Sequence, residues 1–237
     1  MRKVLIVIAV LLIGGLIAAD RIGVVVAQNE IGRRMAQQNN LPNDPRVTIH
    51  GFPFLTQAVG GTYDRIDVNV GDWTTPEKVT VHELKVEFSG LHASLGDVIN
   101  NNTSNITADK GSASAIVPYD AIKKQAPSQV ESISASGTDL QLKGTFAVAG
   151  LIKAPLTVTV RLAPTAKGIA VTPDTVQNGT GPKIPVGLLQ QQLTFVVPVT
   201  NLPVGSRISQ VEVTPTGLRV TATANNVHFS ELPQSPL

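Results

Sequence analysis

The fold is decided by residues 47–73, VTIHGFPFLTQAVGGTYDRIDVNVGDW. Four of the chain's nine aromatic residues fall within these 27 positions: Phe52, Phe54, Tyr63 and Trp73. Pro53 fixes its own φ angle and biases Phe52 toward an extended conformation, so the two Phe rings should flank a stiff bend. The stretch therefore predicts a strand, an aromatic corner, a loop and a second strand.

The second strand follows the Gly60-Gly61 break, where residues 62–70 alternate between apolar and polar side chains. Successive side chains of a strand point to opposite faces, so this pattern predicts a half-buried strand. Its apolar face holds Ile66, Val68 and Val70, and its polar face holds Arg65, Asp67 and Asn69. The corner before it has two interpretations, a hydrophobic plug under the loop or an apolar lip that meets lipid.

The N-terminus carries an export signal, because Arg2-Lys3 precedes sixteen uncharged, mostly aliphatic residues at 4–19. The positive end should stay in the cytoplasm, and everything after Asp20 should lie outside. Cleavage after Ile17-Ala18-Ala19 is one outcome. Retention as an anchor is favoured, since the apolar run resumes at Ile22 and at 24–26 as if one helix continued.

Charge and cysteine content exclude several classes of protein. Without Arg2 and Lys3, 17 basic residues face 17 acidic ones, and no basic stripe is present, so nucleic acid is not an expected partner. The chain has no Cys, which excludes disulfides, thiolate metal sites and a lipidated Cys. Aromatic residues make up only 4% of the chain, so aliphatic side chains must fill its core.

Along the chain, residues 21–38 predict the longest soluble helix, with an imperfect apolar stripe. Its members are Ile22, Val25, Val26, Ile31 and Met35. We expect its Ile22, Val25 and Met35 side to meet the membrane or a sheet. Short helices are expected at 118–126 and 185–193, and the rest predicts antiparallel strands with one apolar and one wet face.

Three finer features accompany these strands. The alternation slips near His82-Glu83, which predicts a β-bulge. Two hairpins are expected, one at 156–171 and the other at 208–220. The organisation is then a signal peptide or anchor at 1–19, a single domain at 20–230 and a disordered tail at 231–237.

The sequence offers no catalytic or metal-binding candidate. It lacks a Gly-x-Ser-x-Gly elbow, a phosphate loop, a dinucleotide glycine motif and a His-Glu-x-x-His pair. His82 and Glu83 are adjacent, so on a strand they point to opposite faces. We therefore expect no enzymatic activity and no cofactor.

Several motifs together resemble one family. They are the export helix ending in Asp20-Arg21, the corner Gly51-Phe52-Pro53-Phe54-Leu55, Gly61-x-Tyr63, and the segments Leu202-Pro203-x-Gly205 and Gly217-Leu218-x-Val220. Over nearly the whole chain this combination is similar to the LmeA family of actinobacterial cell-envelope proteins. The resemblance implies an α+β fold similar to the tubular lipid-binding (TULIP-like) proteins, with a strongly curved antiparallel sheet wrapped around a helix and an N-terminal membrane helix.

The resemblance also implies phospholipid binding, in the periplasmic space or at the outer face of the cytoplasmic membrane. The candidate lipid-binding residues are Phe52, Pro53, Phe54, Leu55, Ile66, Val68 and Trp73. Pattern alone leaves open whether the aliphatic sheet face holds acyl chains in a groove or forms a dry core, and it favours the core. Two rivals remain: a structural envelope protein that binds polysaccharide or a protein partner, and an exported hydrolase.

Overall fold

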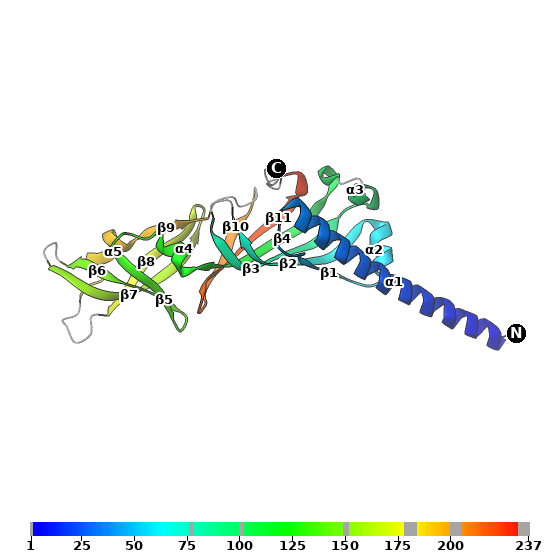
Figure 1. Ribbon diagram of the computed structural model, residues 1–237, viewed down its shortest axis with the longest axis horizontal. Helices are drawn as coiled ribbons and strands as arrows, with labels where there is room; N and C mark the ends of the chain where they lie inside the picture. The colour runs from blue at the N-terminus through cyan, green and yellow to red at the C-terminus, as the bar shows by residue number, and fades with distance from the viewer. Residues whose placement is uncertain are drawn as a thin grey trace.

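The computed structural model describes residues 2–75, 78–99, 102–148, 152–177, 184–199 and 205–231. It confirms the expected α+β class, with a long N-terminal helix and strongly curled antiparallel sheets in an elongated molecule (Figure 1). Residues 202–204 of the motif Leu202-Pro203-x-Gly205 and residues 232–237 of the expected tail at 231–237 lie outside the described residues.

The first helix, α1 (Arg2–Gln38), runs without interruption through the export segment and the predicted helix at 21–38. Among the described residues it is the one helix that is long and apolar enough to cross a membrane. Its N-terminal part projects from the body, and its C-terminal part packs against the body (Figure 1).

The strands of the described chain form two antiparallel sheets, where the alternation alone suggested one. The first has six strands in the order β1-β2-β3-β4-β11-β10. These are β1 (Arg46–His50), β2 (Thr62–Thr74), β3 (Thr80–His92), β4 (Thr107–Pro118), β10 (Arg207–Val213) and β11 (Gly217–His228).

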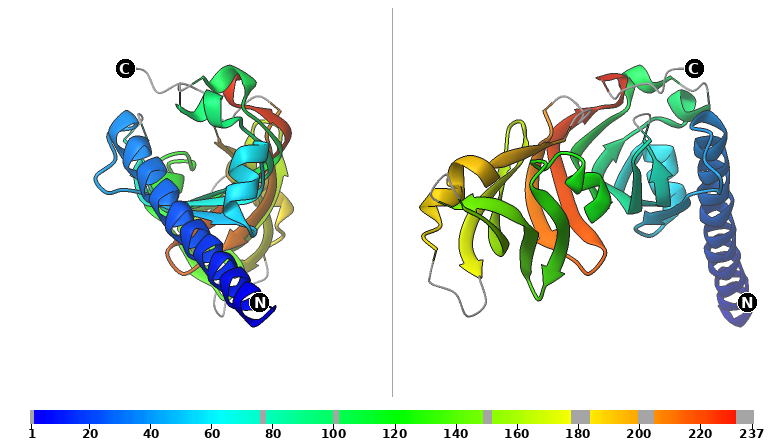
Figure 2. Two further views of the ribbon diagram at one scale, coloured as in Figure 1. Left: turned by 90° about the vertical axis from the view of Figure 1, so that its right-hand side faces the viewer. Right: turned by 60° about the vertical axis from the view of Figure 1, so that its left-hand side comes forward.

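The second sheet has five strands in the order β5-β6-β7-β8-β9. These are β5 (Val130–Ser136), β6 (Asp139–Val148), β7 (Ile152–Thr165), β8 (Gly168–Gln177) and β9 (Phe195–Pro198). Both expected hairpins are confirmed as β7–β8 and β10–β11. Viewed along the long axis, the strands curl around it (Figure 2, left).

Short helical segments connect the strands. They are α2 (Phe54–Gly60), α3 (Leu95–Ile99), α4 (Tyr119–Lys123), α5 (Gly187–Leu193) and the 3-10 turns Thr103–Asn105 and Phe229–Glu231. The predictions at 118–126 and 185–193 are confirmed as α4 and α5.

The predicted bulge in β3 is confirmed. The register with β4 shifts between His82 and Lys85, and Glu83 adopts a positive φ of 52°. Because one extra residue is absorbed there, Leu84 and Val86 stay on the apolar face of the six-stranded sheet.

Two hydrophobic cores divide the length of the molecule. One lies at the α1 end, where Val24 packs with Val47, Ile49, Ile66 and Val68. The other joins the five-stranded sheet to β10 and β11. The apolar face of the six-stranded sheet is therefore covered at one end by α1 and at the other by the second sheet.

The predicted stripe on α1 proves to be two separate faces. Ile31 and Met35 pack on the α1-end core, whereas Ile22, Val25 and Val26 are exposed. Residues 22 and 31 are nine positions apart, about two and a half turns at 3.6 residues per turn, so they point in opposite directions. The packing face is instead Val24, Ala27, Ile31 and Met35.

The segment after the aromatic corner is helix α2, so the prediction of a loop there was wrong. Neither Pro nor Gly interrupts residues 54–59, and Gly61 ends the helix in the left-handed conformation at φ 67°. Seven residues are too few for an isolated helix to be stable in water, so α2 depends on tertiary contacts that its own sequence does not reveal.

At Gly32, α1 closely approaches Pro45, the residue just before β1. A Cβ atom at this position would lie 2.5 Å from the carbonyl oxygen of Pro45. Gly32→Ala should therefore separate α1 from β1 and lower the free energy of unfolding by about 1–3 kcal/mol, the usual cost of overpacking.

Gly23→Ala is the matched control, since its Cβ would meet Leu55 at an ordinary 3.5 Å. Thermal unfolding of both variants checks this. Equal thermal unfolding midpoints for the two variants would show that α1 and Pro45 are not in close contact.

Candidate functional site

The seven predicted lipid-binding residues lie in three places. Phe52, Pro53 and Leu55 are exposed at the start of α2, next to α1. Phe54, Ile66 and Val68 are buried in the α1-end core. Trp73 is half-buried, seven residues along β2 from Ile66, about 24 Å at 3.4 Å per residue. The structure therefore brings the corner residues together and places Trp73 apart from them.

Asp20 of α1 holds the start of α2. Its Oδ1 atom accepts a hydrogen bond of 2.8 Å from the backbone N–H of Leu55. The first N–H groups of a helix have no partner within it, and a carboxylate at that end also suits the helix dipole. Pro53, the residue before α2, makes no side-chain cap, so Asp20 supplies the cap from 35 residues away.

Asp20 is buried, with only 2% of the residue exposed. Burial opposes ionisation, but the Leu55 N–H and the Arg21 guanidinium outweigh it and hold the pKa of Asp20 below its ordinary value. The Nε atom of Arg21 lies 3.1 Å from Oδ2 of Asp20. The same guanidinium lies over the ring of Phe52, 5.0 Å from its centroid.

Gln57 fixes the opposite side of α2. Its amide nitrogen donates to the carbonyl oxygen of His50 at 3.2 Å, and its amide oxygen accepts from the N–H of Asp64 at 3.0 Å. It thereby ties α2 to the end of β1 and the start of β2. Together with Asp20, this bond gives the corner a fixed position on α1 and the sheet.

Between the two cores, the apolar face of the six-stranded sheet is only half-buried. We call this region the apolar strip; it consists of Val70, Leu84, Val86, Ala113, Ala115 and Val211. Strand pairing places Val86 beside Ala113, and alternation places the other members on the same face. Leu84, Ala113 and Ala115 pack into neither core. The apolar strip therefore presents a half-buried aliphatic surface across β2, β3 and β4, and Val211 lies apart from its other members, beyond the buried face of β11.

The apolar strip was within reach of sequence reasoning, because its members alternate along β2, β3 and β4. The sequence could not show that Val70, Val86 and Val211 pack only at the edges of the two cores and that Leu84, Ala113 and Ala115 belong to neither. The position of α1 and of the second sheet decides that, and both are tertiary features.

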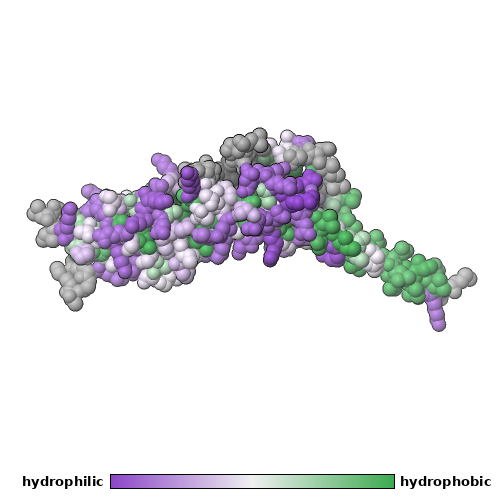
Figure 3. All heavy atoms as spheres, in the orientation of Figure 1, coloured by the Kyte–Doolittle hydropathy of each residue, from purple (hydrophilic) through white to green (hydrophobic). Residues whose placement is uncertain are grey.

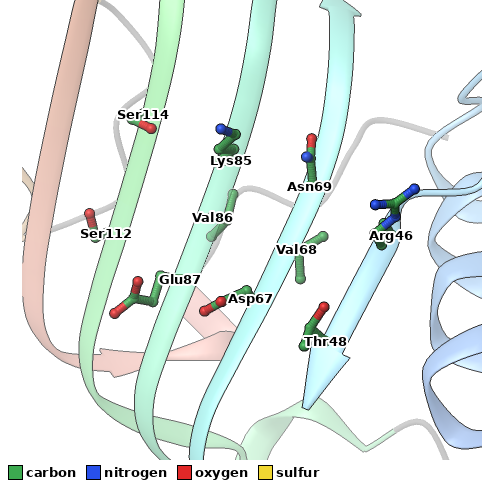
Figure 4. Close-up of a pocket in the computed structure, with 10 residues that line it drawn as sticks. All are labelled: Arg46, Thr48, Asp67, Val68, Asn69, Lys85, Val86, Glu87, Ser112 and Ser114. Atoms are coloured by element: carbon green, nitrogen blue, oxygen red, sulfur yellow. The ribbon is translucent and has the colours of Figure 1, made fainter. Parts of the chain in front are cut away.

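The opposite face of the same strands carries a polar depression with a volume of about 340 Å³ (Figure 4). Polar side chains from β1 to β4 line it: Arg46, Thr48, Asp67, Asn69, Lys85, Glu87, Ser112 and Ser114. A second depression, of about 460 Å³ between β5 and β8, is lined by Glu131, Lys143 and Thr157 among others. These linings suit polar ligands and not acyl chains.

Catalytic geometry is not evident in the described parts of the chain. No group of three or more His, Asp or Glu side chains there could hold a metal ion. The Nε2 atom of His50 lies 2.7 Å from Asp67, and Nδ1 of His82 lies 3.0 Å from Asp72, both on the surface. Glu83, the neighbour of His82, instead accepts from Arg219 at 2.8 Å, which lowers the pKa of Glu83.

Comparison with known families gives one result. The family model described as LmeA-like phospholipid-binding matches residues 18–223, which is most of the chain. Comparison with curated proteins found no match, and neither did comparison with solved structures. The matched region includes Asp20, the corner and the apolar strip.

The cap from Asp20 generates a prediction about α2. Asp20→Ala should release the first turn of α2 and speed hydrogen exchange of the Leu55 amide, because its acceptor is lost. The pKa of Asp20 is lowered in the folded protein. The wild-type cap should therefore be intact at pH values above the unfolded pKa of about 4, and it should weaken only as the pH falls through the lower pKa of the folded state.

Thr56→Ala is the control, since its hydroxyl only bonds the carbonyl oxygen of Pro53. Hydrogen exchange measured by mass spectrometry should show that the amides of α2 remain protected in this variant. Protection that persists in Asp20→Ala would contradict the capping role.

Proposed function

The chain belongs to the LmeA-like phospholipid-binding family, and from that premise we propose that it is a membrane-anchored envelope protein that binds phospholipid by its acyl chains. Its role would be lipid carriage or maintenance of the envelope. Its proposed work is binding and not catalysis, because the family to which it belongs is described as phospholipid-binding.

The apolar strip is the observation that carries this proposal. A soluble domain normally covers the apolar face of a sheet, yet here the aliphatic side chains between the two cores remain half-exposed. An acyl chain along the strip would bury those side chains and its own methylenes, at about 0.8 kcal/mol for each methylene. A handful of such contacts is enough for stable binding.

The predicted site residues have different parts in this proposal. Ile66 and Val68 continue the face of the strip toward α1, and Trp73 lies three residues beyond Val70. Phe52, Pro53 and Leu55 lie at the start of α2. Helix α2 lies at the end of the body that adjoins the projecting helix (Figure 1). We place the entrance for lipid on that side, with Phe54 as a buried support.

A second candidate function is favoured by the polar depression. Its mixture of two cations, two carboxylates and several hydroxyl and amide groups suits a ligand rich in hydroxyl groups, such as an envelope polysaccharide. It shares β2 and β3 with the apolar strip, on the opposite face. Variants in one strand can therefore separate the two functions.

The sequence Leu84-Lys85-Val86-Glu87 provides matched variants, since its side chains alternate between strip and depression. Leu84→Ser with Val86→Ser should weaken phospholipid binding roughly four- to fifteen-fold, if one to two methylene contacts are lost at about 0.8 kcal/mol each. Lys85→Ser with Glu87→Ser should leave it unchanged. Native mass spectrometry with phosphatidylinositol and phosphatidylethanolamine measures the lipid-bound fraction.

Circular dichroism must show both double variants folded. If the wild-type protein forms no lipid adduct with either phospholipid, phospholipid binding is contradicted. Loss of polysaccharide binding in the Lys85 and Glu87 variant would then establish the second candidate.

Topology gives a separate prediction. A reporter that is active only outside the cytoplasm should work when fused after Leu237, because Arg2-Lys3 holds the N-terminus inside. Sequencing the mature N-terminus tests anchoring, and a start at Asp20 would show that the helix is cleaved.

A further inference from the structure

We propose that the outward face of the corner is a wedge that inserts into the bilayer beside α1, where the short apolar run at 4–19 ends. The wedge consists of Phe52, Leu55 and Val59. This inference rests on the anchored state proposed above, and it assigns these side chains to the bilayer itself and not to a carried lipid.

The apolar run of α1 is short for a membrane. Its sixteen residues, 4–19, extend about 24 Å at 1.5 Å per residue, against a hydrocarbon core of about 30 Å. A short span draws the flanking residues toward the bilayer or thins the bilayer around it. The next turn of α1, with Ile22 and Val26 exposed, is therefore pulled to the level of the headgroups and the upper acyl chains.

The charges at that level are already accommodated. Asp20 is shielded by protein, because α2 covers its carboxylate and supplies the Leu55 N–H to it. Arg21 is half-exposed, pairs with Asp20 and lies over Phe52, so its guanidinium can reach the headgroups while its stem stays in apolar surroundings. Drawing this turn into the interface therefore buries no unpaired charge.

The outward face of α2 carries apolar side chains that are exposed and do not belong to the core. Phe54 and Ala58 point inward and are buried, whereas Leu55 and Val59, one helical turn apart, are 39% and 85% exposed. Phe52, just before the helix, is 61% exposed. Such side chains are typical of segments that lie in the membrane interface.

The position of α2 agrees with this role. It contacts α1 at Gly23, three residues past Asp20, where a Cβ atom would lie 3.5 Å from Leu55. Figures 1 and 2 show α2 beside α1 at the end of the body from which the apolar run projects. In Figure 3 the hydrophobic colour continues from that run onto the adjoining end of the body.

Tryptophan fluorescence in the full-length protein tests the wedge. Trp73→Phe removes the chain's one Trp, and Leu55→Trp places a new one on α2. Val196→Trp is the matched control, since Val196 is 42% exposed and lies on β9 of the five-stranded sheet, away from α1 and α2 (Figure 1). In phosphatidylcholine vesicles that contain lipids brominated near the headgroup end of the acyl chain, Trp at 55 should shift to the blue and be quenched. Trp at 196 should show neither effect.

Three results would overturn the proposal. Extraction of the protein from the vesicles by carbonate would overturn the anchored state and the wedge with it. Retention in the vesicles without quenching at position 55 would overturn the wedge and leave anchoring intact. Quenching that disappears when Leu84→Ser and Val86→Ser are added would assign the contact to a lipid bound on the apolar strip, whereas quenching that persists supports insertion into the bilayer.

Discussion

The structure depends on one constraint: the apolar face of a six-stranded sheet must be kept from water. No single element covers it. The C-terminal part of α1 covers the β1 and β2 end, and the five-stranded sheet covers the β10 and β11 end. The apolar strip lies between the two covers. The region that most favours a lipid ligand is therefore the part of the sheet face that neither the helix nor the second sheet fully covers.

Sequence reasoning recovered the parts of this fold that local pattern controls. Alternation located the strands, the hairpins and the slip at His82-Glu83, because side-chain direction in a strand follows a strict period of two. The same alternation runs through β4 and β6, so it could not reveal that they belong to different sheets. Sheet membership depends on which strands pair, and pairing is decided over long distances in the chain.

The site was less predictable for the same reason. The corner was found through its aromatic residues and Pro53, but α2 was missed because its cap comes from Asp20, far back in the chain. Phe52 and Phe54 looked equivalent in sequence, yet one is exposed and the other buried. The apolar residues of α1 likewise suggested one stripe. In the structure Ile31 and Met35 pack against the body, whereas Ile22, Val25 and Val26 are exposed.

The uninterrupted course of α1 limits how this protein can search for a ligand. Residues 2–38 form one helix that contacts the body at Asp20, Gly23 and Gly32, so the helix has no break between its apolar run and the body. With α1 in a bilayer, the domain cannot swing away on a tether and is confined to two-dimensional diffusion. Its encounter rates then depend on the number of copies per unit area of membrane and on their lateral mobility.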